Sequence, residues 1–150
     1  MNTATTDLRD KSIIIAGAST GIGLDTARVC LSCGARVMLC ARSAAPLRDA
    51  ESSLTREYGS DCVASAIADV GNEADVEGLF DEFVRRFERC DGIIHAAAIL
   101  GPIGKITTVV PSDWWDALRI DLFGPWWTNG LLCLRRRIGA VSELLGLRMQ

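Results

Sequence analysis

Short apolar runs alternate with amphipathic stretches along the chain. Four runs of strand length are rich in apolar and β-branched residues and cover residues 12–16, 36–41, 62–68 and 92–97. Runs of this kind, bounded by turn residues, are typical of buried parallel strands. After each run, apolar residues recur at helical spacing, over residues 22–33, 43–58, 72–89 and 112–137. The pattern therefore predicts four strand–helix units in succession.

This alternation predicts an α/β fold with helices on both faces of a parallel sheet. Right-handed crossovers then give a Rossmann-type, doubly wound sheet with strand order 3-2-1-4. With about four strands the sheet looks incomplete, because the fourth strand lies at an edge without a further partner. No linker-like shift in composition interrupts the chain, so we expect one domain over residues 1–150.

Composition and charge narrow the classes of partner. The chain has a formal net charge of −3, which gives no basic face for nucleic acid. No apolar run is long enough for a membrane span, and residues 1–12 do not have the pattern of a secretory leader. We therefore expect a cytoplasmic protein that binds neither nucleic acid nor membrane.

The cysteines predict no metal site. Cys30 and Cys33 have the spacing of a redox or zinc half-site, but they lie at the end of an expected helix. No second Cys or His pair is near, and the single histidine, His95, lies in the fourth strand run. We favour a structural role for this pair.

A glycine loop over residues 17–23, Gly-Ala-Ser-Thr-Gly-Ile-Gly, follows the first strand and opens the first helix. Gly17 permits a tight turn, and Gly21 lets a ligand approach the backbone without meeting a Cβ. Gly23 lets the helix pack close to the strand. Strand before and helix after make this a specific pattern for dinucleotide binding.

The chemistry of the loop suits a pyrophosphate. The first N–H groups of a helix are free and lie at its positive end, so they attract phosphate. Ser19 and Thr20 add hydroxyl donors, and Ile22 lies between the last two glycines. The alternative is a glycine-rich turn without a ligand.

Beyond the loop, residues 11–127 resemble the N-terminal half of the short-chain dehydrogenase/reductase family. The motifs that carry the resemblance are residues 16–23, 68–70, 93–98 and 113–125. The resemblance implies a dinucleotide bound across the strand ends and hydride transfer between NAD(P) and a carbonyl or hydroxyl substrate. It fades after Trp127, and residues 138–150 form a divergent tail.

The end of the second strand favours NADP over NAD. An acid there would bind the adenosine ribose, whereas a basic residue accommodates the 2′-phosphate. Here Ala41 stands at the acidic position, followed by Arg42 and Ser43. A guanidinium is a fork-shaped partner for phosphate. The alternative is that Arg42 is a solvated loop charge.

Other cofactor residues follow from the resemblance. Asp69, with Val70 beside it, matches the family residue that binds the adenine amino group, although a turn acid that caps the next segment is an alternative. Ala96, Ala97 and Ala98 stand where the family has Asn-Ala-Gly. The residues expected to bind the cofactor are therefore Gly17, Ser19, Thr20, Gly21, Ile22, Gly23, Arg42, Ser43, Asp69, Val70, Ala96, Ala97 and Ala98.

The family's catalytic set does not appear in these residues. Family members use a Ser, a Tyr with a Lys four residues later, and an Asn in the long helix. Tyr58 is the single tyrosine, and Cys62 follows it at that spacing. Asp121 stands at the position of the Asn, and an ionised carboxylate cannot donate a hydrogen bond. We therefore expect a truncated family member that is inactive as given, with no substrate identified.

Two alternatives stay open. One is a non-enzymatic module that binds NADP(H) or pairs with a copy of itself or a full-length relative through helix 112–137, which carries all four tryptophans. Packing of these rings in the core would be the simpler explanation for them. The other alternative is an active enzyme that uses Asp121 or His95 as its acid or base.

Overall fold

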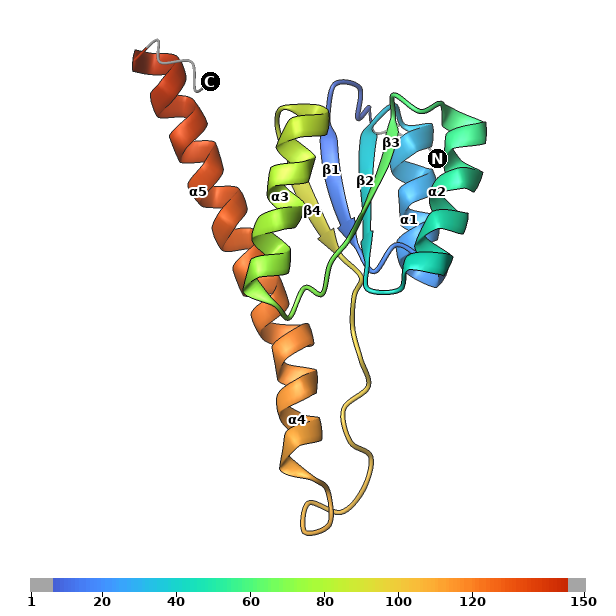
Figure 1. Ribbon diagram of the computed structural model, residues 1–150, viewed down its shortest axis with the longest axis vertical. Helices are drawn as coiled ribbons and strands as arrows, with labels where there is room; N and C mark the ends of the chain where they lie inside the picture. Colours follow the sequence, from blue (N-terminus) through green and yellow to red (C-terminus); the bar gives the residue numbers. More distant parts are fainter. Residues whose placement is uncertain (1–6, 146–150) are drawn as a thin grey trace, which may run out of the picture.

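The computed structural model describes the backbone of residues 7–145 and the side chains of residues 7–134. Strands and helices alternate as expected (Figure 1). The elements are β1 (Ser12–Ala16), α1 (Gly21–Ser32), β2 (Arg36–Ala41), α2 (Ala44–Tyr58), β3 (Val63–Ile67), α3 (Glu73–Phe87), β4 (Gly92–His95), α4 (Pro111–Leu118), a π-helical turn η1 (Arg119–Phe123) and α5 (Gly124–Leu145).

The four strands form one parallel sheet in the order β3-β2-β1-β4, which confirms the predicted topology. In the register of the sheet, Ile14 of β1 lies between Met38 of β2 and Ile93 of β4. β1 is fully inside the sheet and its five residues are all buried. The glycine loop therefore leaves from the most enclosed strand.

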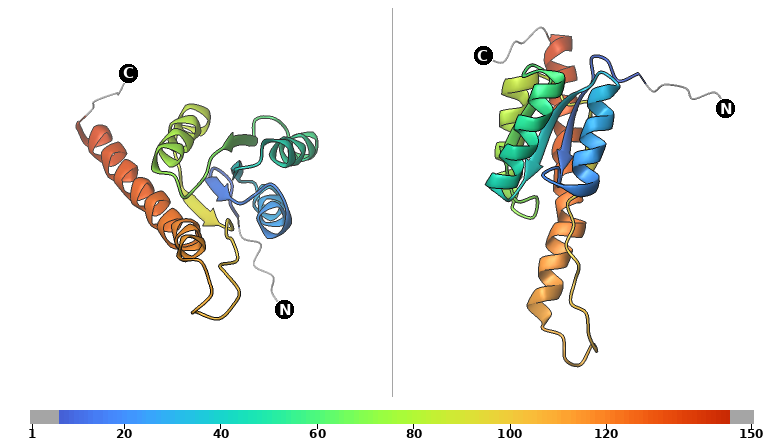
Figure 2. Two further views of the ribbon diagram at one scale, coloured as in Figure 1. Left: turned by 60° about the horizontal axis from the view of Figure 1, so that its bottom comes forward. Right: turned by 90° about the vertical axis from the view of Figure 1, so that its right-hand side faces the viewer.

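Helices cover both faces of the sheet, as expected. Alternate residues of a strand point to opposite faces, so Ile13 and Ile15 pack with α1 and α2, whereas Ile14 and Ala16 pack with α3. Figure 2 shows the sheet between these two layers, with α5 next to α3. Each layer thus has its own apolar core.

Helix α3 shows how the local sequence fixes an element. Asn72 is its N-cap, and the Asn72 side chain accepts a hydrogen bond from the N–H of Asp75 at 3.1 Å. Acids occupy the first turn and arginines the last, which suits the helix dipole. The stripe of Phe80, Phe83 and Phe87 is buried against the sheet.

The expected helix over 112–137 is not one regular helix. It begins at Pro111 rather than at residue 112, because proline is well suited to the first helical position. The π-turn η1 then separates α4 from α5. Helix α5 continues to Leu145, so most of the divergent tail extends the helix, and residues 146–150 lie outside the described residues.

The expectation that the tryptophans pack in the core is wrong for three of the four rings. Trp114, Trp115 and Trp126 are 48%, 64% and 67% exposed. Figure 1 shows why for the first two: α4 and the loop before it extend beyond the carboxyl ends of the strands. Within residues 7–145, no helix is both long and apolar enough to cross a membrane.

Candidate functional site

The glycine loop is fastened to the end of β2. The N–H groups of Gly17 and Ala18 both donate to the carbonyl oxygen of Cys40, at 2.8 and 3.1 Å. Gly17 has φ of +80°, a conformation that glycine adopts without strain. The turn expected at Gly17 is therefore present.

Gly21 and Gly23 are each required as glycine for a different structural reason. A Cβ on Gly23 would collide with the carbonyl group of Gly17, so Gly23 lets α1 pack onto the loop. Gly21 has φ of +57°, and a Cβ there would meet nothing within 4 Å. Gly21 therefore faces open space, where a ligand can approach the backbone.

The N-terminus of α1 is open to an anion. Thr20 is the N-cap, but its side chain makes no capping hydrogen bond, and the first turn contains no acidic residue. The leading N–H groups of this helix are thus not satisfied by a capping side chain. This geometry fits a pyrophosphate.

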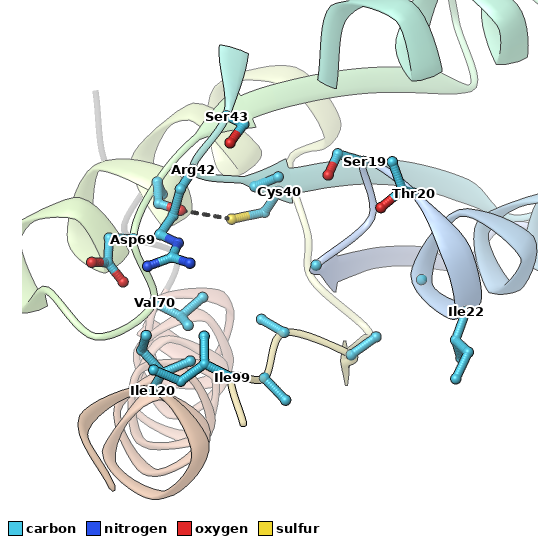
Figure 3. A pocket seen from close by; sticks show the side chains of 17 residues that line it. Ser19, Thr20, Ile22, Cys40, Arg42, Ser43, Asp69, Val70, Ile99 and Ile120 are labelled. Carbon is cyan, nitrogen blue, oxygen red and sulfur yellow. Dashed lines mark hydrogen bonds between the residues drawn. The ribbon is translucent and has the colours of Figure 1, made fainter. Parts of the chain in front are cut away.

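A pocket of about 410 Å³ lies at the carboxyl ends of the strands, within the range of ligand sites. In Figure 3, hydroxyl and guanidinium groups lie along one side, and Val70, Ile99 and Ile120 lie along another. The lining residues are Gly17, Ser19, Thr20, Ile22, Gly23, Cys40, Ala41, Arg42, Ser43, Ala68, Asp69, Val70, Ala96, Ala97, Ala98, Ile99 and Ile120.

The pocket brings together every expected cofactor residue except Gly21. It also contains five residues that were not among the expected cofactor residues. Cys40, Ala41 and Ala68 adjoin expected residues in sequence, so strand-end position could have found them. Ile99 and Ile120 come from the loop after β4 and from η1, and no local pattern indicates them.

Asp69 is held firmly at the rim of the pocket. Its Oδ1 accepts the N–H of Gly71 at 2.9 Å, and its Oδ2 accepts Nη1 of Arg119 at 3.1 Å. Partial burial alone would raise the pKa of Asp69. The hydrogen bonds from Gly71 and Arg119 and the charges of Arg119 and Arg42 outweigh it, so the pKa lies below its usual value. Asp69 is therefore a carboxylate at neutral pH.

Ala96, Ala97 and Ala98 follow β4 and line the pocket. The N–H of Ala96 donates to the carbonyl of Ala16 at 2.8 Å, which continues the pairing of β4 with β1. A Cβ on Gly17 would lie 2.5 Å from the nitrogen of Ala97. The alanine run thus lies directly against the glycine loop.

The candidate acids and bases lie outside the pocket lining. Oδ1 of Asp121, in η1, accepts the N–H of Ile99 at 3.0 Å and so fastens the loop after β4. His95 is half-buried, and this burial lowers its pKa, which favours the neutral ring. Tyr58 ends α2 and packs against the α1–α2 core, and a hydrogen bond with Glu57 raises its pKa. A raised pKa leaves less of a tyrosine ionised at neutral pH, so less of it is available as a base.

Cys30 lies in the last turn of α1, and Cys33 is the C-cap of this helix. Cys30 and Cys33 are both free thiols, and no group of three or more potential ligands is found among the residues that the structure describes.

A family model described as enoyl-(acyl carrier protein) reductase matches residues 17–130, more than half of the chain. The chain belongs to the short-chain dehydrogenase/reductase family. The match includes the glycine loop, Asp69 and Asp121. Short-chain dehydrogenases/reductases bind NAD(P) dinucleotides, which agrees with the open helix end at the loop.

Two curated relatives show how much of the family is present. The uncharacterized oxidoreductase YxnA of Bacillus subtilis is 35% identical over 118 residues, covering 79% of this chain and 32% of the relative. Momilactone A synthase of Oryza sativa is 33% identical over 117 residues, covering 77% of this chain and 41% of the relative. The chain thus spans less than half the length of either relative.

Solved short-chain dehydrogenase/reductase structures share the fold. The oxidoreductase YciK from E. coli superposes with a TM-score of 0.76 at 26% identity, covering 85% of this chain and 53% of that one. A xylitol dehydrogenase with bound NAD⁺ gives a TM-score of 0.76 at 27% identity, covering 85% and 48%. The shared region is the Rossmann half described above.

Replacing Gly23 with alanine tests the close contact at the loop. We expect Gly23→Ala to lower the free energy of unfolding by about 1–3 kcal/mol, because the new Cβ collides with rigid backbone. Binding of NAD(P) should weaken as well, since the loop must shift. The measurements are urea denaturation followed by circular dichroism and calorimetric titration.

Gly78→Ala on α3 is the matched control. A Cβ at Gly78 meets nothing within 4 Å, so this helical substitution should raise the free energy of unfolding by about 0.5–1 kcal/mol. Equal stability losses in the two variants would contradict the collision at Gly23.

Proposed function

We propose that this chain is the NADP(H)-binding half-site of a short-chain dehydrogenase/reductase and prefers NADP(H) to NAD(H). The observation that carries the proposal is the position of Arg42. It lines the pocket at the end of β2, next to Ser43 and beside Asp69. An arginine at this point of the fold recognises a 2′-phosphate rather than a free ribose hydroxyl.

Each part of the pocket has a role in this proposal. The pyrophosphate lies at the N-terminus of α1, against the glycine loop formed by Gly17, Ser19, Thr20, Gly21, Ile22 and Gly23. The 2′-phosphate binds Arg42 and Ser43. The adenine lies beside Asp69 and Val70. Ala96, Ala97 and Ala98 line the path of the cofactor toward its nicotinamide end.

When bound, NADP(H) supplies the hydride for reduction of a carbonyl, or its oxidised form accepts one. The residues of this chain bind and orient the dinucleotide but do not supply the general acid for that reaction. Tyr58 lies on α2, away from the pocket lining, and its raised pKa is unfavourable for proton transfer. We therefore propose that the 150-residue chain binds the cofactor without turning it over.

Arg42→Gln tests the cofactor preference. Loss of the charge should weaken NADPH binding by about 10- to 100-fold, the usual effect of losing a charge-assisted hydrogen bond, and leave NADH binding nearly unchanged. Calorimetric titration of both cofactors gives the two dissociation constants. Arg48→Gln is the matched control, because Arg48 is exposed on α2 and outside the pocket lining. Equal binding of NADPH and NADH by the unmodified chain would refute the preference.

An activity assay tests the absence of turnover. NADPH absorbance at 340 nm, followed with a panel of ketones and aldehydes, should not fall faster with the chain than with buffer. Asp121→Ala and His95→Ala are the informative variants if turnover appears. Measurable oxidation that Asp121→Ala abolishes would show that the chain is an active enzyme with an unusual acid or base.

A second candidate function is a pairing module, and the exposed rings of Trp115 and Trp126 favour it. Large exposed aromatics mark interaction surfaces. If α4 and α5 form such a surface, Trp115→Gln together with Trp126→Gln should weaken self-association at least ten-fold in sedimentation velocity. Val29→Gln, on exposed α1, is the control and should leave it unchanged. A chain that is monomeric before substitution would exclude pairing with its own copy.

A further inference from the structure

Two arginines approach the carboxylate of Asp69 from different elements. Arg119, in η1, donates from Nη1 to Oδ2 at 3.1 Å. Arg42 reaches in from the end of β2, and Figure 3 shows its guanidinium beside Asp69. Within the described residues Arg42 acts on Asp69 through its charge, and no hydrogen bond or ion pair joins them. The Asp69 carboxylate is therefore ion-paired with Arg119 rather than with Arg42.

The contact between Arg119 and Asp69 is built into the local fold. The N–H of Gly71 donates to Oδ1 of Asp69, which fixes the plane of the carboxylate. A Cβ on Gly71 would collide with the Arg119 guanidinium, so the absent side chain leaves room for it. The two ion-paired side chains are only 37% and 25% exposed, so water screens them incompletely.

We propose that Arg119 is a positioning residue for cofactor choice. By pairing with Asp69, it neutralises a carboxylate that would otherwise repel the 2′-phosphate and compete with that phosphate for Arg42. Arg119 does not touch the cofactor in this proposal and acts through Asp69. The proposal rests on the NADP(H) preference proposed above.

The charges around Asp69 make Arg119 important for keeping Arg42 available to a phosphate. Asp75 accepts a hydrogen bond from the backbone N–H of Asp69, at 2.9 Å. Asp116 lies 3.9 Å from Nε of Arg119. Asp75 and Asp116 thus add negative charge around the pair formed by Asp69 and Arg119. Without Arg119, the Arg42 guanidinium would be the remaining cation of this group, and Asp69 would attract it away from a phosphate.

The ratio of the NADH to the NADPH dissociation constant isolates this effect. The two cofactors differ only in the 2′-phosphate, so a general loss of stability or of an adenine contact affects both and cancels in the ratio. A change of one unit charge near the phosphate should alter the ratio by about five-fold. A purely structural role of Arg119 would leave the ratio unchanged.

The experiment is calorimetric titration of NADPH and NADH into five charge variants and the unmodified chain. Arg119→Gln should lower the ratio about five-fold, and Asp69→Asn should raise it by a similar factor. The double variant restores the original charge balance and should return the ratio to its starting value. Arg119→Lys keeps the charge and should stay close to that value. Arg85→Gln removes a similar ion-paired arginine, bonded to Glu82 on α3, and is the control.

Several outcomes separate this inference from the proposed function. If the unmodified chain prefers NADPH and Arg119→Gln keeps the same ratio, the inference fails and the proposed function stands. If Arg119→Gln does not fold, Asp69→Asn decides, and an unchanged ratio there also overturns the inference. If the unmodified chain does not prefer NADPH, both fail. If Arg119→Gln lowers the ratio strongly in 50 mM salt but much less in 500 mM salt, the result would support an electrostatic cause.

Discussion

The carbonyl oxygen of Cys40 accepts two N–H groups of the glycine loop, and the shape of the site depends on this contact. It holds the turn after β1 against the end of β2, while Gly17 lies against the backbone of Ala97 after β4. Three chain segments therefore meet at one point, and side chains larger than hydrogen do not fit at Gly17 or Gly23. The floor of the pocket and the direction of α1 follow from that close approach.

Apolar periodicity was sufficient to predict the strands and the helical layers, and the right-handed crossover rule then gave the strand order. The reason is physical: the crossover helices of a parallel sheet cover both of its faces, so a strand such as β1 is apolar along its whole length. The glycine loop was predictable because backbone conformation and close packing restrict residue type locally. All expected cofactor residues except Gly21 line one pocket, since the ends of parallel strands share one edge.

Contacts over long sequence separations were not predictable. Arg119 meets Asp69 across 50 residues, and Ile99 and Ile120 reach the pocket only through the path of the last helix. The break in that helix is equally hidden, because residues 119–123 have ordinary helical composition. Burial of the tryptophans was predicted wrongly for another reason. Apolar character predicts burial only when a partner surface exists, and α4 extends past the end of the sheet.

The π-turn η1 has a consequence for how this part of the chain tolerates change. A π-turn accommodates one residue more than the α-helix it interrupts. Each residue of an α-helix turns the next by about 100°, so removing one residue here would rotate α5 relative to α4 by that amount. Ile120, now buried beside the pocket, and Phe123, now exposed, could not both keep their surroundings. Insertions and deletions in this short turn should therefore be tolerated far less well than substitutions.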